Sequence, residues 1–452
     1  MGRDLKGTKV IVLGAGLAGL AAARDLEADG ATVTVVEARN RVGGRVVSIK
    51  KGFHGGQHAE GGADLIEAAQ TAVRELATEL GLAPVRILAR GWGFYGPDAR
   101  GRYRIHTANN AFRESGRRLE REVADYTVAE KRWDSPVARV LARQSVAQWM
   151  ASQGASRTFE AGLRGLRGFF LADPEELSLI ALVDQLAASG QAASAPGPAV
   201  DRSFRIRGGN EALPRALARA LRSKVKLQHV VRRIARTDDE VVVTCEHGNG
   251  RHELRGDYCV AALPASTLRD VVFEPRLPDD QHRAIATLKY GRATRVLLQF
   301  GRRFWRQTHR PGAFGTDLPT GAVWDANEEQ AGPAGILSLL AGGRASGELQ
   351  SILATEGTNG VARRLSWLAS TGVTPTPTGA AVLVWDDDPW VKGGYAVFDP
   401  SFDPALRAWL ARPTGRILFA GEHTSLYWQG YMNGAVESGR RAAAEVRALA
   451  QA

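Results

Sequence analysis

Residues 9–45 read KVIVLGAGLAGLAAARDLEADGATVTVVEARNRVGGR, and this stretch decides the fold. An apolar run over residues 10–13 predicts a buried strand, and three glycines then follow with the spacing G-x-G-x-x-G: Gly14, Gly16 and Gly19. In a strand–turn–helix unit the first glycine permits the tight turn, the second lets the backbone approach a pyrophosphate, and the third lets the helix pack on the strand. Unpaired N–H groups at the helix N-terminus favour negative charge. The stretch therefore predicts a dinucleotide-binding unit.

A second strand and an acid complete this unit. Residues 32–36 read TVTVV, and Glu37 follows them at the place where a carboxylate can accept hydrogen bonds from a ribose hydroxyl. The alternative is a secretory signal, with a basic start over residues 3–9 and an apolar region over residues 10–23. Because cleavage there would destroy the whole strand–turn–helix–strand–acid unit, we favour dinucleotide binding.

Composition bounds the class of protein. The 452 residues, 44% hydrophobic and 24% charged, are those of a soluble globular chain with two or three domains or one large composite fold. No uncharged apolar run reaches the roughly 18 residues that a membrane-spanning helix needs. The two cysteines, Cys245 and Cys259, exclude a disulfide framework and favour a reducing, cytoplasmic location. We expect no metal site, because His54, His58 and His423 lack metal-ligand spacing and look like polar loop residues.

The positive charge does not indicate a nucleic-acid partner. Lys and Arg number 59 against 48 Asp and Glu, which gives a net charge of +11. The arginines are spread along predicted helices, and no element interleaves basic residues with stacking aromatics. We therefore interpret them as solvated helix faces.

The rest of the chain alternates between helical and strand-like patterns. We expect a helix from residue 71, a hairpin over 91–104, helices over 110–190 and a loop over 192–198. Strands near 230–234, 241–244 and 258–263 should return to the nucleotide domain. Further strands are expected over 295–300, 335–341 and 380–385, followed by a final strand, turn and helix. The fold class is therefore α/β: a Rossmann-like domain plus an α+β domain with a mostly antiparallel sheet and a helical insertion.

The motifs together resemble the flavin-containing amine oxidase family, which includes monoamine, polyamine and L-amino acid oxidases. The resemblance rests on VIVLGAGLAGL with Glu37, RVGGR at 41–45, EGGADLI at 60–66, RIRGGNEAL at 205–213, VVRRI at 230–234, AALP at 261–264, FGRRFW at 300–305 and FAGEHTSLYWQGYMNGAVESGRRAA at 419–443. It implies an FAD-binding domain made of residues 1–85, 204–288 and 411–452. Residues 86–203 and 289–410 would form the substrate-binding domain.

The resemblance also implies which residues hold FAD. They are Gly14, Gly16, Ala18, Gly19, Glu37, Ala38, Arg39, Gly44, Arg45, Gly62, Val231, Trp385, Gly421, Glu422, Tyr431 and Met432. Family members with covalently held flavin carry a cysteine where this chain has Gly394, so the resemblance implies non-covalent FAD.

The implied substrate site is an aromatic cage. Tyr395 and Tyr431 match the two rings that flank the amine, and Trp428 and Trp385 lie nearby in the pattern. Aromatic faces can orient an amine, because they attract positive charge; the alternative is that these rings only fill a core. The implied reaction passes a hydride from the amine to the flavin and releases an imine, and dioxygen then yields hydrogen peroxide.

Three residues in two regions depart from the family pattern. Arg295 stands where many members have a lysine that acts through a water, and it could bind a substrate carboxylate or alter that water, or Lys289 could take part instead. Asp64 and Glu67 stand where L-amino acid oxidases carry a carboxylate-binding arginine, so they could attract a second ammonium. Alternatively, Asp64 is a solvated turn residue and Glu67 a charge at a helix N-terminus.

These observations lead to three hypotheses about function. The first is FAD-dependent oxidation of an amine, with Arg295, Tyr395, Tyr431, Trp428 and Asp64 at the reaction site. The second keeps the fold for a desaturase or oxidative cyclase acting on an amide or another biosynthetic intermediate, and the third is a non-catalytic, FAD-dependent partner protein. The expected partners are a small amine and dioxygen, with neither nucleic acid nor membrane, and a homodimer is left open.

Overall fold

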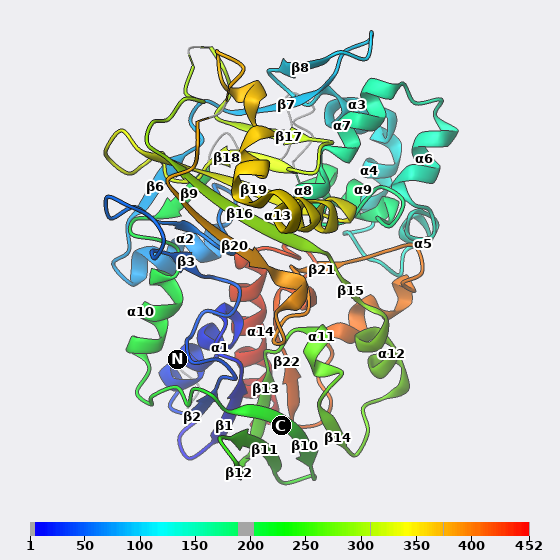
Figure 1. The fold of residues 1–452 in the computed structure, drawn as a ribbon. Helices are drawn as coiled ribbons and strands as arrows, with labels where there is room; N and C mark the ends of the chain where they lie inside the picture. Colours follow the sequence, from blue (N-terminus) through cyan, green and yellow to red (C-terminus); the bar gives the residue numbers. More distant parts are fainter. Residues whose placement is uncertain (1–4, 189–202, 308, 374, 452) are drawn as a thin grey trace.

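The computed structural model describes residues 5–188, 203–307, 309–373 and 375–451. The loop predicted over residues 192–198 lies outside these ranges. Figure 1 shows a parallel sheet with its helices in the lower part of the molecule, and a larger sheet with the helical insertion in the upper part. Within the described ranges no helix has the length and apolar character to cross a bilayer.

The predicted dinucleotide unit forms the centre of the lower part. Its sheet contains β1 (Lys9–Leu13), β2 (Thr32–Val36), β13 (Tyr258–Ala261) and β22 (Ile417–Phe419), in the order β2-β1-β13-β22 with every neighbouring pair parallel. Helices α1 (Leu17–Ala28) and α14 (Met432–Leu449) pack together, and a Cβ on Gly439 would lie only 2.2 Å from the carbonyl oxygen of Ala18. The predicted strand–turn–helix–strand unit and the terminal strand and helix are confirmed.

A second sheet lies beside the parallel one. It consists of β10 (Val230–Arg236), β11 (Val241–His247), β12 (Gly250–Gly256) and β14 (Val272–Glu274), in the order β12-β11-β10-β14. We expected the strands near 230 and 241 to return to the nucleotide domain together with residues 258–263. β13 joins the parallel sheet, whereas β10 and β11 pair in the neighbouring sheet, where the turn at Gly248 (φ +56°) leads β11 into β12; the domain to which they belong stays a prediction.

The upper sheet is mostly antiparallel, as predicted. Its order is β20-β16-β19-β18-β17-β7-β8, and only the β17–β7 pair is parallel. The strands are β7 (Trp92–Pro97), β8 (Tyr103–His106), β16 (Ala293–Phe300), β17 (Ala313–Thr316), β18 (Ala322–Asp325), β19 (Gly335–Gly342) and β20 (Gly379–Val384). Helix α13 (Arg344–Arg363) covers one face through a core that includes Val296, Leu339 and Leu349. The strand predicted to reach Trp385 ends at Val384, and Trp385 begins a 3-10 turn.

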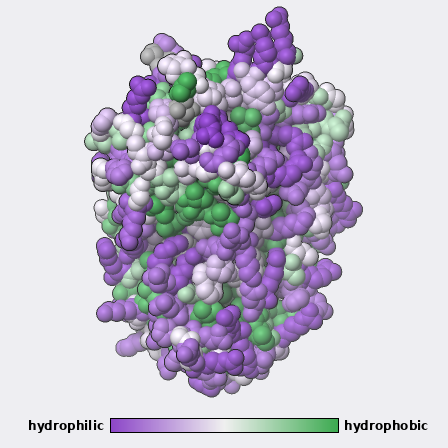
Figure 2. Space-filling model, in the orientation of Figure 1, coloured by the Kyte–Doolittle hydropathy of each residue, from purple (hydrophilic) through white to green (hydrophobic). Residues whose placement is uncertain are grey.

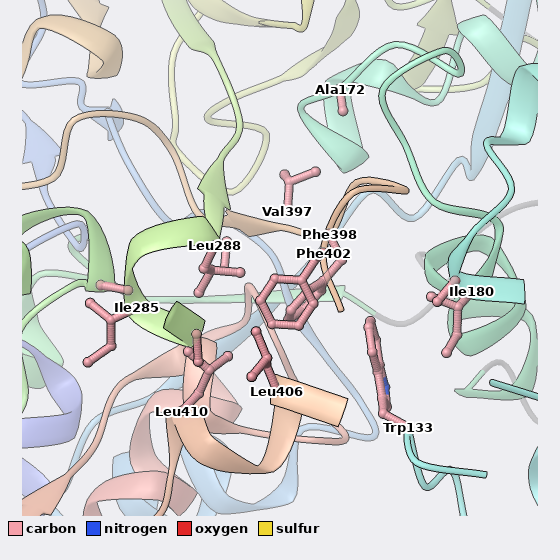
Figure 3. Packing of buried hydrophobic residues seen from close by; sticks show 14 of the residues in the cluster. Trp133, Ala172, Ile180, Ile285, Leu288, Val397, Phe398, Phe402, Leu406 and Leu410 are labelled. Carbon is pink, nitrogen blue, oxygen red and sulfur yellow. The ribbon is translucent and has the colours of Figure 1, made fainter. Parts of the chain in front are cut away.

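The helical insertion is confirmed over residues 110–188. Its helices are α3 (Asn110–Arg118), α4 (Glu120–Val128), α5 (Pro136–Ala142), α6 (Val146–Ser152), α7 (Arg157–Arg164), α8 (Arg167–Phe170) and α9 (Leu179–Ala188). Several of these helices are short and begin at a serine. The Ser145 hydroxyl oxygen, for example, accepts a hydrogen bond from a backbone N–H at the start of α6. In Figure 3, Trp133 packs on Phe398 and Phe398 on Phe402, with ring centroids 4.4 and 4.8 Å apart. This cluster fixes the insertion against the chain that follows β21 (Ala396–Val397).

Shorter elements connect these parts. They are β3 (Ser48–Ile49), β4 (Ala59–Glu60), β5 (Ile66–Glu67), β6 (Pro84–Ile87), β9 (Ser203–Ile206), β15 (Lys289–Tyr290), α2 (Thr71–Glu79), α10 (Ala212–Ala220), α11 (Ala265–Leu268) and α12 (Asp279–Thr287). Figure 2 shows hydrophilic residues over most of one face of the molecule, with hydrophobic residues gathered in separate patches. This agrees with the interpretation of most of the charge as solvated surface.

Candidate active site

One cavity of about 520 Å³ runs between the lower and upper parts of the fold. Its walls come from the turn between β1 and α1, the segment after β2, the start of β10, helix α9, and the segments before β21 and α14. The structure brings to it all of the proposed site residues except Gly19: Gly14, Gly16, Ala18, Glu37, Ala38, Arg39, Gly44, Arg45, Gly62, Asp64, Val231, Arg295, Trp385, Tyr395, Gly421, Glu422, Trp428, Tyr431 and Met432. Gly19 instead packs α1 on β1, since a Cβ there would lie 2.0 Å from the carbonyl oxygen of Gly14.

The dinucleotide end of the cavity has the shape that a pyrophosphate needs. Gly14 adopts φ +96° at the turn, and helix α1 begins at Leu17 with Gly16 as its N-cap. A Cβ on Gly16 would have no protein atom within 4 Å, so the backbone at the helix N-terminus is open to a ligand. The residues present therefore fit the phosphates of a dinucleotide.

Glu37 lies at the end of β2 and is almost completely buried. Its carboxylate accepts hydrogen bonds from the backbone N–H groups of Ala15 (2.8 Å) and Arg39 (2.9 Å). Burial raises its pKa, and these two hydrogen bonds oppose that rise. The carboxylate is thereby held at the cavity wall, next to the glycine turn, where the sequence predicted a ribose contact.

An ion pair between Arg45 and Glu422 joins an early and a late segment of the chain at the cavity wall. Arg45 donates to Glu422 Oε1 at 2.7 Å and to the carbonyl oxygen of Gly394 at 2.9 Å, and Gly430 N donates to Glu422 Oε2 at 2.9 Å. Burial disfavours both charges, but the pair raises the pKa of Arg45 and lowers that of Glu422. The pair thus fixes the segments before and after Tyr395 and the start of α14 relative to the glycine turn.

His423 differs from the expected polar loop residue. Its side chain is 1% exposed and does not line the cavity, and burial lowers its pKa to about 4. Among the described residues, Nδ1 has no hydrogen-bond partner, although Arg407 donates to the backbone oxygen of His423. The described residues contain no group of three or more potential metal ligands. That the protein binds no metal stays a prediction.

The predicted aromatic residues Tyr395, Tyr431 and Trp428 line the same cavity as the glycine turn. Tyr395 donates its hydroxyl hydrogen to the carbonyl oxygen of Phe169, and Tyr431 donates to Gln185 Oε1 at 3.4 Å. Trp428 packs edge-on against Tyr431 with ring centroids 5.7 Å apart. Burial raises the pKa of both phenols, so both tyrosines are neutral near pH 7. The two hydroxyls are anchored on the helical insertion, and both side chains line the same cavity.

Arg295 belongs to a buried polar cluster. The cluster consists of Glu60, Asp64, Arg205, Arg295 and Ser338. Arg295 donates to Ser338 Oγ at 2.6 Å, to the carbonyl oxygen of Gly62 at 3.1 Å and to Asp64 Oδ2 at 3.5 Å, and its guanidinium lies 4.7 Å from the ring centre of Trp324. Asp64 also accepts from Arg205 and, at 2.8 Å, from Trp324. Both terminal nitrogens of Arg295 are therefore engaged within the protein.

The surroundings of Asp64, Glu67 and Lys289 differ from the sequence expectations. Asp64 is buried rather than solvated, and the guanidinium groups of Arg205 and Arg295 compensate its charge, while its attraction for a second ammonium stays a prediction. Glu67 lines the cavity from β5, not from a helix N-terminus. Lys289 pairs with Asp399, its side chain is 59% exposed, and it does not line the cavity, so it cannot replace Arg295.

The sequence missed the residues that the helical insertion contributes. Phe112, Leu166, Phe170 and Leu177 form an apolar wall, and Asp184 and Gln185 of α9 add polar groups to it. The available signal was an isolated acid–amide pair inside an otherwise apolar helix, LIALVDQLAA. Such a pair is costly in a helix buried on all sides, and it indicates a polar environment on one face.

Comparison with known proteins agrees with this geometry. The family model described as "Flavin containing amine oxidoreductase" matches residues 17–447. A Mycobacterium tuberculosis protein whose name describes a flavin-containing monoamine oxidase is 29% identical, over 97% of this chain and 96% of its own length. The flavin-dependent L-tryptophan oxidase of Lentzea aerocolonigenes is 28% identical over 98% of both chains. The solved cyclohexylamine oxidase of Brevibacterium oxydans superposes with a TM-score of 0.85 at 25% identity, over 98% of this chain and all of the other.

Proposed function

The chain belongs to the family of flavin-containing amine oxidoreductases, and we propose that it oxidises the C–N bond of a small amine inside the cavity described above. It is an FAD-dependent oxidoreductase. The observation that carries the proposal is the continuity of one cavity from the glycine turn at Gly16 to the tyrosines Tyr395 and Tyr431. A cofactor held at the first end would reach a substrate held at the second.

We infer that the dinucleotide end holds FAD through the residues named for it in the sequence. Gly14, Gly16 and Gly44 would face the phosphates and Glu37 the adenosine ribose, because these groups offer open backbone and a fixed acceptor. Glu422 and Arg45 would hold the segments along the flavin. In support of a domain formed by residues 1–85, 204–288 and 411–452, each of these segments contributes at least one strand to the parallel sheet.

Non-covalent binding is supported by the surroundings of Gly394. A Cβ at this position would lie 2.3 Å from Leu171 Cδ1, so a cysteine there has no room without a shift. Both cysteines of the chain are buried in strands β11 and β13, and neither lines the cavity.

At the substrate end the protein's own residues orient the amine and exclude water. Tyr395 and Tyr431 would present aromatic faces to the amino group, while Trp428 and the wall of the helical insertion keep the site dry. When bound, FAD supplies the acceptor for the hydride that leaves the carbon next to the nitrogen, and dioxygen reoxidises it with formation of hydrogen peroxide. Arg295 would place a fixed cation in the cavity wall, since its guanidinium is locked by Asp64, Ser338 and Gly62.

We propose an amine without a carboxylate as the substrate. The tryptophan oxidase relative raises an amino acid as an alternative, and an amino acid needs a cation for its carboxylate. Arg295 is the candidate that the sequence offered, but both of its terminal nitrogens donate to Asp64, Ser338 and Gly62. A cytoplasmic location and a homodimer stay predictions.

The roles of the two tyrosines are tested by matched substitutions. Tyr395→Phe and Tyr431→Phe keep the ring and lose the hydroxyl, whereas Tyr395→Ala and Tyr431→Ala lose the ring. If the aromatic faces orient the amine, the alanine variants should reduce their flavin about 10- to 100-fold more slowly, and the phenylalanine variants within about threefold of the unmodified protein. Equal flavin content in all variants provides the control. Alanine variants that react at the original rate would remove the proposed role.

A further inference from the structure

The helical insertion forms one lobe of the cavity, and this lobe combines an apolar wall with a carboxylate. Phe112, Leu166, Phe170, Leu177 and Ala181 line it with apolar atoms. Asp184, one turn after Ala181 in α9, lines the same lobe and is half-buried. An acid in such a wall is costly unless a polar partner meets it.

Asp184 is only partly satisfied by the protein. Its Oδ1 accepts a hydrogen bond from the Tyr126 hydroxyl at 3.1 Å, and within the described ranges it forms no ion pair. Lys131 and Arg407 act on Asp184 electrostatically without an ion-pair contact: Arg407 donates to the carbonyl oxygens of His423 and Ser425, and Lys131 lies 5.6 Å from the ring centre of Tyr427. Burial raises the pKa of Asp184, whereas Lys131, the hydrogen bond from Tyr126 and Arg407 lower it.

The carboxylate is close to the site where the amine is oriented. Gln185, the next residue of α9, accepts the hydrogen bond from the Tyr431 hydroxyl. Asp184 and Tyr431 therefore line one cavity together with the apolar side chains of the insertion. Asp64 differs, because two arginines already compensate its charge.

We propose that Asp184 recognises a second ammonium group of the substrate, so that the enzyme prefers amines with a cationic group at the far end of an apolar chain. This inference rests on the proposed function and specifies its substrate class. One amino group would lie between Tyr395 and Tyr431, the apolar chain would contact the lobe, and the second ammonium would donate to Asp184. Tyr126 is then a positioning residue, because it holds Oδ1 of that carboxylate.

The test compares two substrates of equal length, hexan-1-amine and hexane-1,6-diamine. Flavin reduction is measured without oxygen for the FAD-loaded protein and for Asp184→Asn, which keeps an acceptor for Tyr126 and removes the charge. Hydrogen bonds to charged groups predict that the substitution lowers the diamine-to-monoamine ratio of reduction efficiency about 10- to 100-fold. Reduction by the monoamine should change little.

Two control variants separate recognition from general effects of charge. Asp125→Asn removes an exposed carboxylate of α4 that lies 3.8 Å from Arg121, and should leave the ratio unchanged. Glu67→Gln removes a second acid of the cavity wall, one to which the inference gives no role. A ratio that falls with Glu67→Gln and not with Asp184→Asn would overturn the inference.

The inference and the proposed function fail in different ways. If the unmodified protein oxidises both amines equally well and Asp184→Asn changes nothing, the proposed function stands and the role of Asp184 is wrong. If no amine reduces the flavin, the proposed function fails. The inference is then decided by the dissociation constants of the diamine and the monoamine, measured from the change in flavin absorbance when each amine binds. A diamine that binds no more tightly than the monoamine to the unmodified protein would then overturn it.

Discussion

Replacing Asp64 by asparagine should destabilise the fold through the buried polar cluster. Within the described part of the chain, the substitution removes the only carboxylate that contacts both Arg205 and Arg295, and it weakens the hydrogen bond from Trp324. Arg205 keeps Glu329 at 3.2 Å, whereas Arg295 keeps only the neutral acceptors Ser338 and the carbonyl oxygen of Gly62. One buried guanidinium is therefore left without an anion.

The expected loss can be bounded from these contacts. Removing one partner of a buried ion pair costs about 3–5 kcal/mol in the free energy of unfolding. Glu60 offsets part of this loss, because burial and then Asp64 raise its pKa to about 8, and without Asp64 it ionises more readily. We therefore expect the lower end of that range, about 3 kcal/mol, for Asp64→Asn.

Denaturant unfolding of the FAD-loaded protein, followed by tryptophan fluorescence, measures this loss. Asp125→Asn is the control, because its carboxylate is 58% exposed and surface pairs contribute at most about 1 kcal/mol. A loss below about 1 kcal/mol for Asp64→Asn would refute the view that Asp64 is committed to the two arginines.

Three further outcomes follow from the cavity and its surroundings. Since the pKa of Glu60 is raised from 4.5 to about 8 in the fold, the unfolded chain binds fewer protons than the native one between these values, so stability should fall as pH rises through 8. Unfolding of Glu60→Gln at pH 6 and pH 9 should show a weaker dependence, and an unchanged slope would exclude Glu60 as its source. Gly16→Ala should keep its stability and lose FAD affinity, whereas Gly19→Ala should lose stability as well, because only the second Cβ meets protein atoms; thermal unfolding and flavin titration distinguish the two. Acid precipitation should release all of the FAD, and flavin retained in the pellet would show a covalent link.

The sequence predicted the parts of the site that lie in short motifs. Gly14, Gly16 and Glu37 are separated by fixed numbers of residues in one strand–turn–helix–strand unit, so local geometry places them together. Tyr395, Tyr431 and Glu422 were found through motifs of the resemblance, and all three line the cavity.

Other features depend on contacts between distant segments and could not be read from the chain. The compensation of Asp64 depends on Arg205 in β9 and Arg295 in β16, which are 141 and 231 residues away. Asp184 lines the cavity from the insertion, which packs through Trp133 against Phe398 of a segment more than 200 residues later (Figure 3). The separate sheet of β10 and β11 likewise results from strand pairing that strand propensity does not specify.

The most direct test of FAD-dependent amine oxidation is the absorbance of the purified, FAD-loaded protein mixed with amines in the absence of oxygen. The panel contains monoamines, diamines and amino acids. The account predicts that at least one amine bleaches the oxidised flavin, that air restores it, and that one hydrogen peroxide forms for each amine oxidised. A protein that binds FAD and keeps it oxidised with every amine in the panel would contradict the account.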